Sequence, residues 1–190
     1  ASLFADGAAA ALVGMPTATD RHYFLLDAFH TDMKPDTQDE MVWQIGDHGF
    51  TLRLSPRIPD HLTDVAPAAL LAVMAARAPS FWAIHPGGRA IVDGLQELFG
   101  LADEAVAASR EVLRDFGNLS SATILFVLNR LADKLADGDA TLTGVAMAFG
   151  PGLTVEMARL TYVPAAFAGD GAADGRTVAA DAVSLPLSRG

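Results

Sequence analysis

Two short segments of the sequence combine residues that could bind and polarise a carbonyl oxygen. Residues 82–88 read Trp-Ala-Ile-His-Pro-Gly-Gly and supply His85, and residues 117–122 read Gly-Asn-Leu-Ser-Ser-Ala and supply Asn118. Both side chains can donate a hydrogen bond without carrying a charge. Two such donors aimed at one point stabilise the oxyanion or enolate that forms from a thioester carbonyl. The two segments therefore predict a site for acyl chemistry.

The nucleophile that would complete such a site is missing, because the chain has no cysteine. Its absence excludes disulfides, thiolate metal sites and a cysteine nucleophile within these 190 residues. No metal is expected either, since the remaining histidines lack the spacing of metal ligands. They are His22, His30, His48 and His61.

Composition is typical of a globular protein with a substantial core. About half of the residues are apolar and the net charge is -10, so a nucleic-acid partner, which requires clustered Lys and Arg, is not expected. No apolar run reaches the length of a membrane span. The Ala-rich start lacks the basic region of a signal peptide, and a cytoplasmic location is expected.

Hydrophobic periodicity predicts a mixed α/β fold, with helices packed on a mixed sheet of about five strands. Residues 34–44 read as a polar connection. The last two strands are expected to pair antiparallel across Gly150-Pro151-Gly152. The expected strands are residues 8–13, 22–32, 50–54, 81–84, 142–149 and 153–163, and the expected helices are residues 67–77, 88–98, 103–116 and 120–135.

Both candidate residues also have a purely structural interpretation. His85 could be a core histidine beside a turn, and Asn118 could end one helix or cap the next. The functional interpretation places His85 near a helix N-terminus, where the dipole disfavours imidazolium and leaves a neutral donor. Gly87 and Gly88 would let a ligand approach the backbone. The two residues taken together with the closing hairpin favour a site.

In order and spacing, these motifs resemble the C-terminal half of a type III polyketide synthase, in the chalcone and stilbene synthase family. The resemblance covers about residues 3–163. It implies a thiolase-like fold, of which residues 1–163 form the C-terminal half, followed by an Ala/Gly/Asp-rich, partly flexible tail at residues 164–190. The motifs are residues 3–10, 85–88, 109–113, 117–122 and 149–154.

The resemblance implies an acyltransferase that condenses malonyl-CoA units, with decarboxylation, onto an acyl-CoA starter in secondary metabolism. Its catalytic residues here would be His85 and Asn118. The nucleophilic cysteine would lie in an N-terminal half that this chain does not include. CoA thioesters would be substrates, no further cofactor would be needed, and the enzyme would be a homodimer.

The same resemblance implies a set of substrate-binding residues. Phe4 matches the gatekeeper between the CoA tunnel and the cavity, and Ala5 replaces the glycine after it. Trp43 falls where plant enzymes carry a cavity-lining glycine, and Leu52 falls at a second, usually aromatic, gate. The other matched positions lie along the pantetheine arm or the cavity wall: Gly87, Gly88, Ala90, Ser120 and Pro151.

Two alternatives remain open. A ketoacyl-ACP synthase III shares the fold and the Cys-His-Asn chemistry, but that family follows its His with Gln-Ala-Asn, whereas Pro86-Gly87-Gly88 follows His85 here. The second alternative is a non-catalytic half-domain used for pairing, which would account for the missing cysteine. It gives no chemical reason to keep His85 and Asn118 together.

Overall fold

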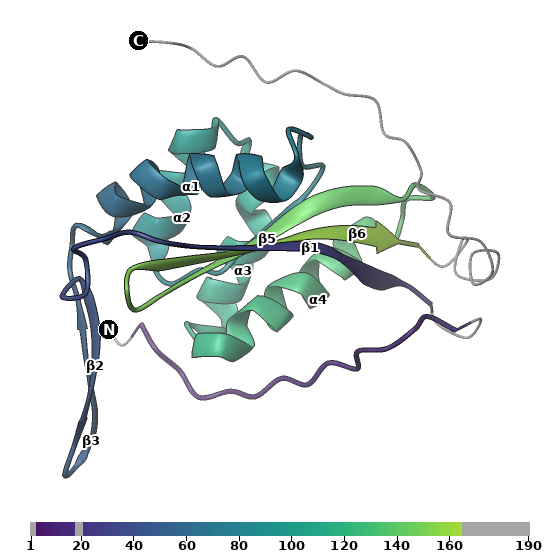
Figure 1. Cartoon of the computed structure of the whole chain (residues 1–190). Coiled ribbons are helices and arrows are strands. Elements are labelled where there is room, and N and C mark those ends of the chain that lie inside the picture. The colour runs from purple at the N-terminus through teal and green to yellow at the C-terminus, as the bar shows by residue number, and fades with distance from the viewer. Residues whose placement is uncertain (1–2, 18–20, 165–190) are drawn as a thin grey trace.

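The structure is a computed structural model, and it describes residues 3–17 and 21–164. A four-stranded sheet has the order β1-β6-β5-β4, in which β4 is parallel to β5 and the other neighbours are antiparallel. A second sheet is the hairpin β2-β3, which projects from the body (Figure 1). The elements are β1 (Tyr23–Met33), β2 (Met41–Gly46), β3 (Gly49–Leu54), α1 (Ile58–Met74), β4 (Trp82–Ile84), α2 (Arg89–Phe99), α3 (Asp103–Phe116), a 3-10 turn (Ser120–Ala122), α4 (Thr123–Leu135), β5 (Leu142–Gly150) and β6 (Thr154–Val163).

Helices cover both faces of the four-stranded sheet, with α1 and α2 on one side and α3 and α4 on the other (Figure 1). The alternation of side chains along a strand separates the two cores. On β5, Val145 and Met147 pack into the cluster with α1 and α2, while Ala146 packs into the cluster with α3 and α4. Both faces of β5 are therefore buried, and packing on both sides holds the strand in place.

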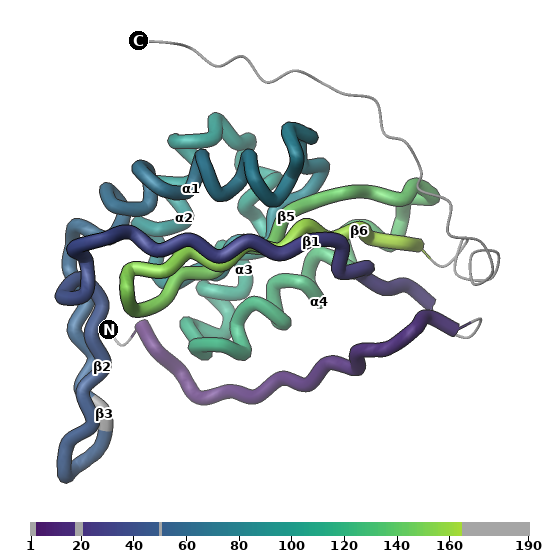
Figure 2. Tube along the Cα trace, in the orientation of Figure 1, coloured from purple at the N-terminus to yellow at the C-terminus, as the bar shows by residue number. Residues whose placement is uncertain are grey.

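The hairpin β2-β3 extends away from the end of β1 (Figure 2). Its register places Trp43 directly opposite Leu52. The loop before it is tied to the β5-β6 turn, because the buried Thr37 Oγ1 accepts a hydrogen bond of 2.5 Å from the Leu153 N–H. The hairpin is thereby anchored beside the Gly150-Pro151-Gly152 turn.

Most of the expected elements are confirmed. The helix α3 has the predicted bounds, α2, α4, β5 and β6 differ from prediction by a few residues at most, and β5 pairs antiparallel with β6. The start of α1 is wrong by nine residues, since the helix begins at Ile58 rather than Pro67. Pro59 lies in its first turn, where a missing N–H breaks no helical bond, and Pro67 is inside it.

Three further expectations are wrong. Residues 8–13 form no strand: they run as an exposed, extended segment that pairs with no described strand (Figure 2). Residues 34–44 are not all connection, because the largely apolar Met41–Gly46 forms β2 and pairs with β3. The main sheet has four strands rather than five.

The predicted tail, residues 164–190, lies outside the described residues apart from Pro164. Among the helices of residues 3–17 and 21–164, none is both long and apolar enough to cross a membrane.

Candidate active site

His85 follows the last residue of β4, and backbone hydrogen bonds fix its position. Its N–H donates to the Met147 carbonyl at 2.8 Å, which continues the pairing of β4 with β5. The buried Ser109 hydroxyl on α3 donates to the carbonyl of Ile84 at 2.7 Å. Burial lowers the pKa of His85 below its ordinary value of 6.5, so the neutral imidazole is favoured.

Asn118 follows α3 after Gly117, whose φ of +75° and ψ of -168° are a conformation that favours glycine. A Cβ on Gly117 would also lie 3.2 Å from the Leu3 carbonyl and from the Ala5 Cβ. That close approach lets residues 3–5 bond the backbone of Asn118, which donates to the Leu3 carbonyl at 2.9 Å and accepts from the Ala5 N–H at 3.0 Å. Phe4 is thereby placed beside Asn118.

Asn118 is 4% exposed, and two backbone groups hydrogen-bond its side-chain amide. Oδ1 accepts from the Ser120 N–H at 2.9 Å, and Nδ2 donates to the Gly87 carbonyl at 3.2 Å. A backbone N–H can only donate and a carbonyl can only accept, so these contacts distinguish the oxygen from the nitrogen. One N–H of the amide remains for a ligand.

Gly87 lies between the two candidate residues. Its carbonyl accepts from Asn118, and a Cβ added to it would lie 3.9 Å from His85 Nε2. Gly88 is fully extended, with a φ of 175°, Gly87 is not in the left-handed region either, and a Cβ on either residue would make only ordinary contacts with the protein. The backbone therefore does not require glycine at these positions. The absence of two side chains there leaves space for a ligand in the adjoining cavity.

A cavity of about 590 Å³ opens onto His85 and Asn118. Its lining is mostly apolar and includes residues 3–4, the hairpin β2-β3, the start of α1 and the segments that contain His85 and Asn118. His85 is the only histidine in that lining, and no Asp, Glu, Lys or Arg of the described residues contributes to it. The lining residues are Leu3, Phe4, Met41, Trp43, Leu52, Leu54, Ser55, Pro56, Ile58, Pro59, His85, Gly87, Gly88, Ala90, Ile91, Asn118, Ser120, Ser121, Ile124, Ala148, Phe149 and Pro151.

The structure brings together all but one of the residues expected to bind substrate. Phe4, Trp43, Leu52, Gly87, Gly88, Ala90, Ser120 and Pro151 line the cavity with His85 and Asn118. Ala5 does not, because it is used in the backbone pairing with Asn118. Trp43 lies on a strand opposite Leu52 and is 53% exposed, so its side chain contacts both the cavity and solvent.

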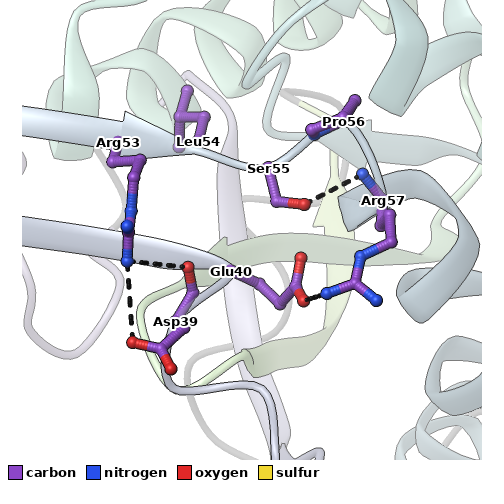
Figure 3. A pocket seen from close by; sticks show the side chains of 7 residues that line it. All are labelled: Asp39, Glu40, Arg53, Leu54, Ser55, Pro56 and Arg57. Carbon is purple, nitrogen blue, oxygen red and sulfur yellow. Dashed lines mark hydrogen bonds and ion pairs between the residues drawn. The ribbon is translucent and has the colours of Figure 1, made fainter.

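A second hollow, of about 470 Å³, lies where β2 and α1 begin (Figure 3). Its charged groups bind one another: Arg57 pairs with the buried Glu40, and Arg53 lies 3.6 Å from Asp39. A hydrogen bond from Ser55 lowers the pKa of Glu40, burial opposes that shift, and the charge of Arg57 lowers the pKa further. Neither His85 nor Asn118 lines this hollow, and its ion pair between Glu40 and Arg57 connects the start of β2 to the start of α1.

Sequence reasoning missed one residue beside Asn118. Ser120 and Ser121 lie in the 3-10 turn that precedes α4, but among the described residues neither side chain makes a capping bond. Thr123 Oγ1 instead accepts from the Leu119 N–H at 2.8 Å, next to the Asx-type bond that the Ser120 N–H donates to Asn118 Oδ1. A threonine at the first position of α4 is the signal that could have indicated this arrangement.

A model of the family described as "Chalcone and stilbene synthases, C-terminal domain" matches residues 26–164. The match covers more than half of the chain and includes His85 and Asn118, so the chain belongs to this family. The predicted resemblance and the thiolase-like fold class are confirmed. Members of the family are acyltransferases that carry out condensation reactions.

Proposed function

We propose that this chain supplies the His and Asn of a Cys-His-Asn condensing enzyme, a type III polyketide synthase that extends an acyl-CoA starter with malonyl-CoA. The observation that supports it is the convergence of His85 and Asn118 on one apolar cavity, with Gly87 between them. The cysteine comes from an N-terminal half, because the chain has none. This chain together with that half is called the complete enzyme below.

Loading of the starter requires a thiolate. Burial favours the neutral form of His85 in this chain, and a cysteine thiolate beside it would favour its protonated form. The cysteine thiolate attacks the acyl-CoA carbonyl carbon, and collapse of the tetrahedral adduct expels the CoA thiolate, which takes the proton held by His85. His85 thereby assists the attack as the partner of the cysteine thiolate.

Extension requires two hydrogen bonds to one oxygen. The thioester carbonyl of malonyl-CoA accepts from the remaining Asn118 N–H and from His85. Loss of CO₂ leaves the electron pair of the broken C–C bond on an enolate, whose oxygen these donors stabilise. The enolate carbon attacks the acyl-cysteine, which releases the cysteine thiolate. No resident cofactor is needed, since the thioester itself is the activated group.

The partnership with a cysteine-bearing half is supported by the surface of the extended segment. Leu12 is fully exposed, and Val13 and Met15 are 76% and 89% exposed. An extended, apolar segment without strand partners is suited to pairing with another sheet. The N-terminal half supplies that sheet, and two complete enzymes form the homodimer.

The lining of the cavity favours an apolar starter. Among the described residues, its lining has no charged side chain apart from the titratable His85, and its polar groups come from His85, Asn118, the indole of Trp43 and three serines, Ser55, Ser120 and Ser121. A charged acyl group would lose its hydration there without a counter-charge. An aliphatic or aromatic acyl-CoA is therefore the preferred starter class.

The test is a radiolabelled malonyl-CoA assay of the complete enzyme with a panel of acyl-CoA starters, scored by labelled product and by released CO₂. Apolar starters are expected to give product, and His85→Gln is expected to abolish it. His48→Gln, an exchange on an exposed turn residue, is the matched control and should leave activity unchanged. Full activity of His85→Gln would refute the proposal.

A further inference from the structure

The hydroxyl of Thr123 lies behind the Asn118 amide, on the side away from Gly87. Thr123 is the first residue of α4 and is fully buried. Its Oγ1 accepts from the Leu119 N–H at 2.8 Å, so one lone pair is occupied by a backbone donor. Its single proton is directed to Asn118 Oδ1 at 3.5 Å. The hydroxyl therefore contacts both the side chain of Asn118 and the residue that follows it.

These contacts complete the environment of Oδ1. The Ser120 N–H and the Thr123 hydroxyl are the donors next to the oxygen, and the Gly87 carbonyl is the acceptor next to the nitrogen. If the amide rotated by half a turn, its NH₂ would face the Ser120 N–H, its oxygen would face the Gly87 carbonyl, and the Thr123 proton would lose its acceptor. Both outcomes leave buried polar groups unpaired, which costs more than the hydrogen bonds are worth.

We propose that Thr123 is a positioning residue that holds the Asn118 amide with its nitrogen toward the cavity. It acts on the amide oxygen directly and, through the Leu119 N–H, on the backbone next to Asn118. The inference rests on the proposed role of Asn118 as a donor to the substrate. Thr123 itself does not line the cavity and has no contact with the reacting atoms.

The test compares two exchanges at this position in the complete enzyme. Thr123→Val keeps the shape and removes the hydroxyl, and it is expected to lower malonyl-CoA decarboxylation about tenfold, the factor equivalent to one buried hydrogen bond. Thr123→Ser restores the hydroxyl and should stay within about twofold of the native rate. Thr63→Val removes the hydroxyl of a threonine on α1, away from the cavity, and is the matched control.

A double-mutant cycle separates positioning from a general loss of structure. In an Asn118→Ala background, Thr123→Val should cause no further loss, because the group through which it acts is gone. Equal tenfold losses with and without Asn118 would overturn the proposal, as would a Thr123→Val enzyme that decarboxylates at the native rate.

A second readout does not depend on activity. The chain has two asparagines, Asn118 and Asn129, so selective ¹⁵N-asparagine labelling of this chain within the complete enzyme gives two side-chain amide signals from it. The Asn118 signal is expected to shift or split in Thr123→Val and to stay native in Thr123→Ser, while exposed Asn129 is unchanged. An unaltered Asn118 signal refutes positioning. If the signal moves but Asn118→Ala retains full decarboxylation, positioning stands and the proposed function fails.

Discussion

Replacing Ser109 by Ala removes the hydrogen bond that the Ser109 hydroxyl donates to the Ile84 carbonyl, directly before His85. β4 is an edge strand of the described sheet. The Phe81 carbonyl and the His85 N–H both form hydrogen bonds with β5. The backbone N–H and C=O groups of the odd-numbered residues of this segment therefore point toward β5, and the Ile84 carbonyl points away from it. Ser109 supplies the donor on that side at 2.7 Å. The exchange therefore leaves a buried carbonyl without its donor.

The expected cost follows from burial. Ser109 and Ile84 are fully buried, so water cannot replace the lost hydroxyl. An unsatisfied buried acceptor costs about 1–3 kcal/mol, and the free energy of unfolding of Ser109→Ala should fall by that amount. Because the free carbonyl immediately precedes His85, decarboxylation should also fall, on the order of tenfold, through misplacement of the imidazole.

Urea denaturation of the complete enzyme measures the first effect and malonyl-CoA decarboxylation measures the second. Ser80→Ala, on an exposed loop before β4, is the control and should change neither. Ser109→Thr, which keeps the hydroxyl, should preserve more activity than Ser109→Ala. A Ser109→Ala enzyme with native stability and native rate would refute the assignment of this bond.

Three further outcomes are expected. In this chain without the cysteine-bearing half, burial lowers the pKa of His85, so below pH 6.5 the unfolded chain binds a proton that the native state does not, and the free energy of unfolding should fall from pH 6.5 down to the folded pKa. The exchange His85→Gln should flatten that slope in urea titrations of this chain, and an unchanged slope would exclude His85 as its source. Trp43→Gly should admit more malonyl extensions or a bulkier starter, because the ring lines the cavity; an identical product profile by mass spectrometry would remove Trp43 as a determinant. The chain alone should be inactive and should associate through its exposed Leu12, Val13 and Met15; a clean monomer by light scattering with normal turnover would contradict this.

The elements that the sequence predicted well are those with their own strong periodicity. Helix α3 and the β5-β6 hairpin carry regular apolar patterns and turn residues, so local chemistry sufficed. The start of α1 was missed because its expected start was Pro67, whereas Pro59 lies in the first turn of the helix, where proline is compatible with helical structure. The strand β2 was missed because the polar character of residues 34–40 was extended over its first residues, although four of its six residues are apolar.

The site was predictable in composition but not in its internal bonds. His85 and Asn118 stood out because of their residue types and the glycines beside them. Their convergence near Gly87 requires the end of β4 and the end of α3 to meet, which the sequence supplied only through family resemblance. Ser109 was not assigned a role, because a hydroxyl that bonds to a backbone group 25 residues away has no local pattern. Thr123 was missed although its partners are four and five residues away, because the helix was expected to begin at residue 120.

The most direct test of the account is Asn118→Ala in the complete enzyme, with starter loading and malonyl-CoA decarboxylation measured separately. Decarboxylation needs both donors and should fall on the order of a hundredfold or more, whereas loading depends chiefly on the Cys-His pair and should fall far less. Asn129→Ala, the same exchange on the exposed face of α4, should leave both rates unchanged. Equal and mild losses in the two half-reactions would contradict the assignment of Asn118 as the donor that stabilises the enolate.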